Sequence, residues 1–171
     1  METWDTIRSR RNVRDFDARP IGQGDLDRIL EAARRAPSSN NEQPWDFVVV
    51  RERAAAERLS GVWHYGGHIA GAAAVIAFVG GASDEPESRE WIAFDMGQAA
   101  MSAMLAAADL GIGSCHSAVG DQALARDVLG LPGDREVVLL LSLGYPADRP
   151  LAPIAMPSRR AFDDVVHRER W

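Results

Sequence analysis

Lysine is absent from this chain of 171 residues, because all 19 basic side chains are arginines. No Schiff base to a lysine amine can therefore form, which excludes pyridoxal-phosphate enzymes and lysine aldolases. The lysine of a phosphate-binding P-loop is missing as well. Any anion that the chain binds must be held by a local cluster of arginines.

Cysteine and long apolar runs are equally scarce. Cys115 is the only cysteine, so no disulfide can form within the chain. The longest apolar stretch runs from Ala70 to Gly81 and is too short to span a bilayer. The first residues lack the apolar core of a signal peptide. These observations predict a cytoplasmic protein that does not enter a membrane.

Basic residues are also fewer than acidic ones, 19 against 25. The net charge of −6 argues against a nucleic-acid or anionic-membrane partner, since neutralising phosphates over a broad surface requires a basic excess. Hydrophobic residues make up 46% and charged residues 26% of the chain, which is ordinary for a folded protein. No repeat or low-complexity linker interrupts the sequence, so we expect a single domain over residues 1–171.

The spacing of apolar residues predicts strands separated by helices. Helices are expected over 4–10, 24–36, 91–110 and 121–129, and strands over 47–50, 72–79, 114–116 and 136–143. Asp25 is the expected cap of the second helix. Alanines on one face of the 91–110 helix allow another helix to approach closely, in the core or across a dimer interface. The class is α/β or α+β with about four strands.

Three polar segments could carry chemistry. Arg10, Arg11 and Arg14 crowd one segment, where their repulsion is unfavourable unless an anion or nearby carboxylates balance it. Each guanidinium is a planar fork that can bind phosphate through charge-assisted bonds of about 1.5–3 kcal/mol each. A solvated basic patch is the alternative. Arg159 and Arg160 could bind the same anion from the far end of the chain, or form a surface pair.

The third segment, from Pro37 to Trp45, contains hydroxyls and amides without net positive charge. Such a run can hydrogen-bond the edge of a heteroaromatic ring or a polyol, although a turn-rich connection would have a similar composition. Two other pairs have simpler explanations. His64 and His68 have a metal-ligand spacing, but the glycines between them weaken any helix and no third ligand is apparent. Cys115 and His116 are neighbours on a strand and point to opposite faces, which disfavours a thiolate–imidazole pair.

Together these segments resemble the nitroreductase family. The resemblance rests on the arginine segment, on 36–50 with its Pro-Ser-x-x-Asn-x-Gln-Pro-Trp string, on 91–115, and on 159–167. It covers nearly the whole chain in the right order. It implies an α+β, α/β/α sandwich-like fold with a central sheet of about four to five strands flanked by helices. It also implies a domain-swapped homodimer with FMN at the subunit interface.

Carried over by position, the resemblance implies cofactor-binding roles for thirteen residues. The phosphate, ribityl and pyrimidine side would be contacted by Arg10, Arg11, Asn12 and Arg14, with Arg159 and Arg160 completing the phosphate site. The ring and its tail would be reached from the other subunit by Pro37, Ser38, Ser39, Asn41 and Gln43. The backbone around Ala118 and Val119 would face flavin N5.

The implied activity is hydride transfer from NADH or NADPH to FMN, followed by two-electron reduction of a nitroaromatic, quinone or similar acceptor. No catalytic residue of the protein is implied, because the flavin performs the redox step. Asn12 stands where the family usually has serine, Arg14 where a lysine is common, and His116 where short members often have an aromatic residue. Dehalogenation, flavin fragmentation, use of a deazaflavin, or a non-enzymatic flavin-binding role remain alternatives.

Overall fold

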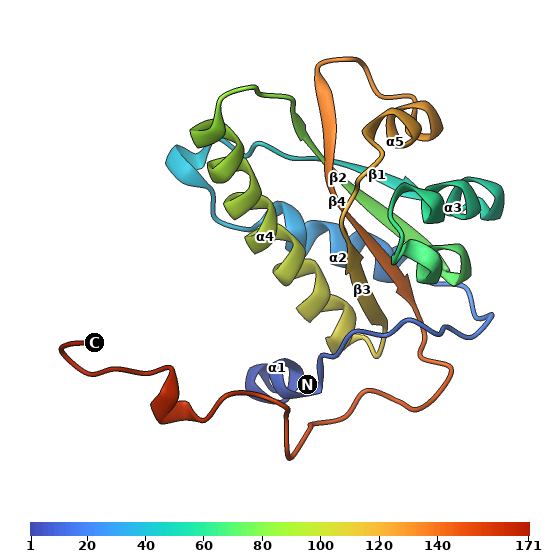
Figure 1. Cartoon of the computed structure of the whole chain (residues 1–171). Helices are drawn as coiled ribbons and strands as arrows, with labels where there is room; N and C mark the ends of the chain where they lie inside the picture. The colour runs from blue at the N-terminus through green and yellow to red at the C-terminus, as the bar shows by residue number, and fades with distance from the viewer.

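A four-stranded antiparallel sheet lies at the centre of the computed structural model, which describes residues 1–171 (Figure 1). Its strands are β1 (Asp46–Val50), β2 (Ala74–Gly81), β3 (Gly113–Ser117) and β4 (Arg135–Gly144). They lie in the order β1-β2-β4-β3, and every neighbouring pair is antiparallel. The four predicted strands are therefore confirmed, and the class is α+β.

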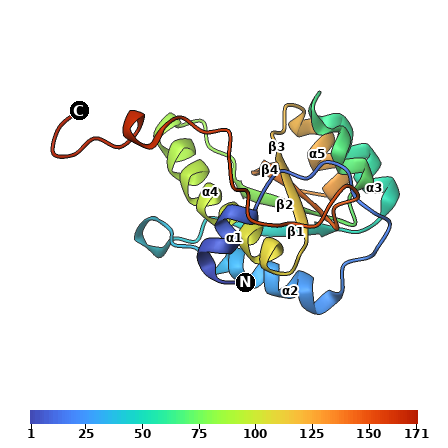
Figure 2. The ribbon, with the colours of Figure 1, turned by 90° about the horizontal axis from the view of Figure 1, so that it is seen from below.

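Helices cover both faces of this sheet (Figure 2). One face carries α2 (Gln23–Arg34) and α4 (Pro86–Asp109), and the other carries α3 (Arg53–Leu59) and α5 (Gln122–Leu129). The short α1 (Thr3–Ser9) packs beside α4. Four 3-10 turns complete the chain: η1 (Ser39–Asn41), η2 (Ser60–Val62), η3 (Gly66–Gly71) and η4 (Phe162–Asp164). No helix combines the length and the apolar character that crossing a membrane would require.

The side chains of β2 alternate between two hydrophobic cores, one on each face of the sheet. Ile76 and Phe78 point toward α2 and α4, whereas Val75 and Val79 point toward α3 and α5. This is the two-residue period of a strand, and each fully buried side chain of this size contributes about 1.5–3 kcal/mol. A sheet that is buried on both faces leaves only its edges and ends for contact with a ligand.

Two helix predictions need correction. The helix expected from residue 91 begins at Pro86. Proline suits the first turn of a helix, because an N–H at that position would have no partner within the helix. Asp25 does not cap α2, because the cap position is Gly22 and Asp25 lies inside the first turn. The alanine face of α4 packs into the core, with Ala99 and Ala103 fully buried. Close packing of this helix against another was thus predicted correctly, and the packing occurs in the core of the subunit.

Beyond β4 the chain continues as an extended arm, whose first part, residues 145–154, runs alongside residues 8–17. The backbone N–H of Ile154 donates to the carbonyl of Arg8 at 3.1 Å, which fixes the start of the arm against α1. Residues 158–171 are all exposed, including the apolar side chains of Phe162 and Val165 in and after η4. Figures 1 and 2 both show the C-terminus far from the body. From Ser158 onward the arm makes few contacts with the rest of the chain.

Candidate functional site

The arginine segment lies along the edge strand β3. Asn12 forms a parallel bridge with Ser114, and the N–H of Val13 donates to the carbonyl of Ser114 at 3.0 Å. Further on, the N–H of Asp17 donates to the carbonyl of Tyr145, just after β4. The sheet edge therefore fixes the backbone from which the predicted cofactor-binding side chains project.

Two glycines allow this close approach. Gly113 and Gly144 are register partners at the adjoining ends of β3 and β4. A Cβ on Gly113 would lie 2.6 Å from Val13 Cγ2, and a Cβ on Gly144 would lie 2.7 Å from Phe16 Cδ1. Only a residue without a side chain fits at such distances. The position of the arginine segment thus depends on two residues about a hundred positions away in the sequence.

The three arginines of the segment have different partners. Arg10 is half-buried and donates from Nη1 to Asn12 Oδ1 at 3.2 Å, without meeting a carboxylate. Arg14 is exposed and makes no ion pair. Arg11 instead binds Asp148 Oδ1 at 2.6 Å, and this hydrogen bond lowers the pKa of the Asp148 carboxyl. Arg10 and Arg14 therefore keep free guanidinium groups, whereas Arg11 already has an anionic partner in the arm.

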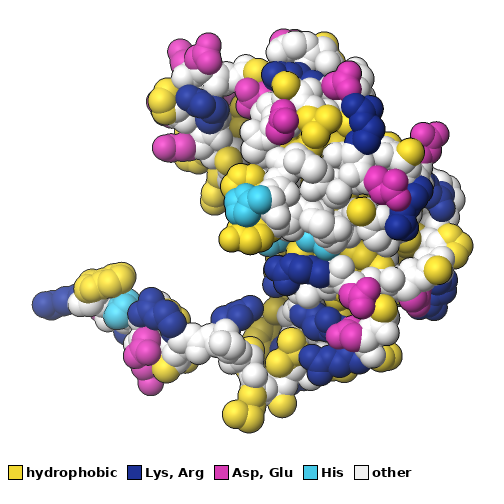
Figure 3. All heavy atoms as spheres, turned by 45° about the vertical axis from the view of Figure 1, so that its right-hand side comes forward, with side chains coloured by type: hydrophobic (Ala, Val, Ile, Leu, Met, Phe, Trp, Pro, Cys, Tyr) yellow, Lys and Arg dark blue, Asp and Glu magenta, His cyan; other side chains and the backbone are white.

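His68 lies near the arginine segment, where the charge of Arg14 acts on its ring. His68 Nδ1 is 2.8 Å from Ser142 Oγ, and no three His, Cys, Asp or Glu side chains lie together as a metal site would require. Burial, followed by the charges of Arg14 and His116, lowers the pKa of His68. Cys115 is buried and His116 is exposed, as their alternation on β3 predicted, and burial raises the pKa of the Cys115 thiol. Figure 3 shows histidine and arginine side chains together at the hollow between the body and the arm.

Free backbone donors follow β3. No acceptor within the chain receives the N–H of Ala118 or Val119. The next two N–H groups, of Gly120 and Asp121, both donate to the carbonyl of Val62, at 2.9 and 3.0 Å. The turn between β3 and α5 is thereby held in place. Its two unpaired donors, where the family resemblance places contacts to flavin N5, remain available to a ligand.

The polar loop from Pro37 to Trp45 has a constrained backbone. Asn40, Asn41 and Gln43 have φ values of 50°, 58° and 52°, in the left-handed region that non-glycine residues rarely adopt. Ser38 Oγ accepts the N–H of Gln43 at 3.0 Å inside the loop. Such conformations persist only where surrounding contacts impose them. The exposed side chains of Asn41 and Gln43 are thus presented from a defined backbone.

A buried carboxylate in α4 supports this loop. Asp95 is 2% exposed and accepts the backbone N–H of Ser39 at its Oδ2, 3.1 Å away. The Gln98 amide lies 3.4 Å from its other oxygen. The sequence reasoning did not single out Asp95, although the residue belongs to the 91–115 stretch that carried the family resemblance. A buried acidic residue on a helix gives no sequence signal of the loop it will contact.

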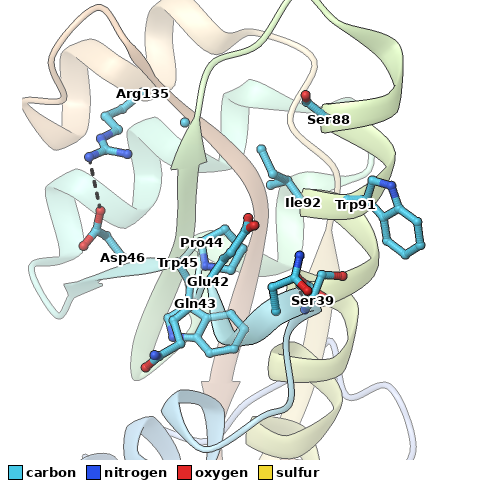
Figure 4. A pocket seen from close by; sticks show the side chains of 13 residues that line it. Ser39, Glu42, Gln43, Pro44, Trp45, Asp46, Ser88, Trp91, Ile92 and Arg135 are labelled. Atoms are coloured by element: carbon cyan, nitrogen blue, oxygen red, sulfur yellow. Dashed lines mark hydrogen bonds and ion pairs between the residues drawn. The ribbon is translucent and has the colours of Figure 1, made fainter.

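A cavity of about 860 Å³ lies between this loop and the first turns of α4 (Figure 4). Ser39 and Gln43 line it, and Ile92 of α4 points into the same region. Asp46 and Arg135 close one side, with 4.0 Å between carboxylate and guanidinium. None of the predicted arginine contacts lines this cavity.

The loop and the arginine segment occupy opposite corners of the sheet. Asp46 pairs with Val79, which pairs with Val137 near the start of β4, whereas Ser114 pairs with Leu143 near its end. Six residues along a strand and three strand spacings place these corners roughly 25 Å apart. The structure brings Arg10, Asn12 and Arg14 alongside β3 but leaves the loop distant. Arg159 and Arg160 lie on the exposed arm, beyond its contact with α1.

These features define an α+β protein with two arginines that have no carboxylate partner against the edge strand β3 and two unpaired backbone donors in the turn after that strand. The chain belongs to the nitroreductase family, whose family model matches residues 7–64 and 60–145. A relative from Archaeoglobus fulgidus, provisionally named NADH dehydrogenase/NAD(P)H nitroreductase, is 34% identical over 96% of both chains. Membership and this relative support an oxidoreductase.

Solved structures agree with this assignment. A Clostridium acetobutylicum protein, provisionally named NADH oxidase, superposes with a TM-score of 0.86 at 25% identity, over 98% of this chain and 100% of its own. A protein from Clostridium difficile R20291, described as an FMN-dependent nitroreductase, superposes with a TM-score of 0.84 at 24% identity, over 97% and 98%. The nitroreductase-type fold predicted from the sequence is therefore confirmed.

Proposed function

We propose that this chain is an FMN-dependent oxidoreductase that uses NADH or NADPH to reduce a nitroaromatic, a quinone or a similar acceptor by two electrons. Bound FMN would supply the redox chemistry, accepting hydride at N5 and passing two electrons on. The C. difficile protein of the same fold is described as FMN-dependent. The observation that carries the proposal is a pair of arginines without a carboxylate partner in the segment against β3, together with the unpaired N–H groups in the turn that follows β3.

The residues present fit FMN. Arg10 and Arg14 have no carboxylate partner and can each donate charge-assisted bonds to a phosphate or to an electron-rich ring edge. The amide of Asn12 lies beside Arg10 and can donate to phosphate in place of the usual serine. Arg11 would join them by exchanging Asp148 for the phosphate. The donors of Ala118 and Val119 suit an acceptor atom on a ring edge.

A homodimer would complete this site. The loop carrying Pro37, Ser38, Ser39, Asn41 and Gln43 lies at the far corner of its own sheet, so it reaches the same ligand only from a second copy. The exposed arm, with Arg159 and Arg160, is free to pack on that copy as a swapped element. Apolar side chains on the outer face of α4, including Trp91 and Phe94 at 54% and 60% exposure, offer surface for the contact.

The direct test is an absorbance spectrum of the purified protein before and after addition of NADH or NADPH. The protein should be yellow, or become so with added FMN, and the reduced nucleotide should bleach the flavin absorbance under anaerobic conditions. Admitting a nitrofuran or a quinone should restore it. A protein that binds no FMN would refute the cofactor assignment. One that binds FMN but is not bleached by either nucleotide would refute the enzymatic one.

A further inference from the structure

A chain of hydrogen bonds fixes the ring of His68. Nδ1 of this residue, in η3, lies 2.8 Å from Ser142 Oγ on β4, and that hydroxyl donates to the carbonyl of Cys115 on β3 at 3.0 Å. Ser142 is fully buried, and a hydroxyl has a single proton to donate. In the arrangement that these bonds describe, the hydroxyl proton points to the carbonyl, Nδ1 of His68 donates to Ser142 Oγ, and Nε2 is the nitrogen that can take up a further proton.

The neighbours of His68 keep its ring neutral in the free chain. Arg14, from the arginine segment, and His116, from β3, both oppose a further positive charge, and partial burial adds to their effect. The Cys115 thiol on the same strand is held neutral by its own burial. The ring is bonded to a hydroxyl and not to a carboxylate. Together these surroundings set the pKa of His68 below its usual value of 6.5.

An anion bound beside Arg14 and His68 would raise the pKa of His68, since a negative charge within about 4–6 Å favours the protonated form. We propose that His68 takes up a proton at Nε2 when an anionic group binds beside Arg14, so that cofactor binding is coupled to pH through this side chain. The proton comes from solvent and no electrons move. The inference rests on the proposed function, because bound FMN supplies the anion, either as its phosphate or as the negative charge of the reduced ring.

Calorimetric titration of FMN into the cofactor-free protein at pH 7 tests the coupling. Repeating it in buffers of different ionisation enthalpy gives the number of protons taken up per FMN bound. His68→Asn keeps an N–H near the position of Nδ1 and removes Nε2, and His64→Asn changes an exposed histidine as the matched control. Wild-type and His64→Asn should take up more protons than His68→Asn, by a fraction of one proton. The FMN phosphate titrates in all three proteins, so its contribution cancels in the difference.

A comparison of oxidised with reduced FMN distinguishes the two sources of negative charge. If the phosphate is responsible, the difference in proton uptake is present when oxidised FMN binds. If the reduced ring is responsible, it is absent there, and the midpoint potential of the bound flavin depends more steeply on pH in wild-type than in His68→Asn. Equal uptake and equal slopes in both proteins would overturn the inference. Failure of the chain to bind FMN would overturn the proposed function as well.

A measurement on the unmodified protein guards against a variant that does not fold. The pKa of His68 can be followed by NMR of its ring carbon-bound proton, in the cofactor-free protein and with oxidised or reduced FMN. The inference expects a higher pKa in at least one of the bound states. An unchanged pKa in both would overturn it without any substitution.

Discussion

The buried carboxylate of Asp95 accepts the backbone N–H of Ser39 at 3.1 Å, and so joins the longest helix to the polar loop that precedes β1. That loop has three residues in the left-handed backbone region. Its conformation therefore depends on contacts outside itself, and Asp95 supplies one of them from α4.

Removing this carboxylate should release the loop. Asp95→Ala leaves the Ser39 N–H without its charged acceptor, and should lower the free energy of unfolding by about 1.5–3 kcal/mol in urea denaturation. Hydrogen exchange at the Ser39 amide should become faster. Gln98→Ala is the matched control, because its 3.4 Å contact reaches the other carboxylate oxygen and should cost less than about 1 kcal/mol. Unchanged exchange at Ser39 would show that Asp95 does not hold the loop.

A methyl group at position 113 should displace the arginine segment. In Gly113→Ala the new Cβ would lie 2.6 Å from Val13 Cγ2, and Val13 is itself buried. Overpacking of this kind costs about 1–3 kcal/mol of stability. We also expect weaker FMN binding, because Asn12 and Arg14 flank Val13 and Arg10 lies three residues before it. Gly24→Ala has no atom within 4 Å of its Cβ and should stabilise α2 by up to about 1 kcal/mol. Equal stability of Gly113→Ala and wild-type would contradict the close packing.

Charge reversal at Arg10 should weaken FMN binding by a factor of about 10–100, the equivalent of one charge-assisted phosphate contact. Fluorescence titration of FMN measures this factor. Arg53→Glu on α3 is the control, since Arg53 is exposed and pairs only with Glu57. The quaternary structure of both variants should match wild-type in gel filtration. An unaltered FMN affinity in Arg10→Glu would remove Arg10 from the site.

A charge on the outer face of α4 should separate the subunits. Phe94 is 60% exposed in the single chain, and Phe94→Asp should convert a dimer into a monomer in light scattering after gel filtration. FMN binding should weaken at the same time, because the loop and the arginine segment would no longer meet. Tyr65→Asp, at a residue 74% exposed elsewhere, should stay dimeric. A monomeric Phe94→Asp that keeps full FMN affinity would refute a site shared between subunits.

The stability of the cofactor-free protein should depend on His68 at mildly acidic pH. The folded chain lowers the pKa of His68, so the unfolded chain binds the proton more readily between that lowered value and about 6.5. Stability therefore rises with pH across this window and is lost as the pH falls through it. The decrease in Tm between pH 7.5 and pH 5.5 should be larger in wild-type and His64→Asn than in His68→Asn. Equal decreases in all three would contradict the assignment.

The sequence alone determined a large part of the fold. Apolar runs and helical periods predicted all four strands and the helices α1, α2, α4 and α5, because burial on one or both faces leaves a local pattern of apolar residues; α3 was not predicted. The opposite orientations of Cys115 and His116 followed from the strand geometry. The absence of lysine limited any anion site to arginines, and the arginine segment together with 36–50, 91–115 and 159–167 indicated the family.

The helix boundaries could be predicted less accurately from the sequence. Pro86 begins α4 and Gly22 caps α2, and neither residue is the strong polar start signal on which sequence reasoning depends. The sequence also did not reveal which arginines form ion pairs. Arg11 meets Asp148, which lies 137 positions away, whereas Arg10 and Arg14 meet no carboxylate. Charge counts along the chain could not distinguish the arginine that is already paired from those that are free.

Composition and local periodicity thus decided which segments become helices and strands and which residue types can bind an anion. Tertiary structure decided the rest: that Gly113 and Gly144 admit the arginine segment, that Asp95 supports the loop, and that Ser142 contacts the ring of His68. It also placed the loop and the arginines at opposite corners of one sheet. These relationships depend on close approach of residues distant in sequence, and a local pattern carries no information about such distances.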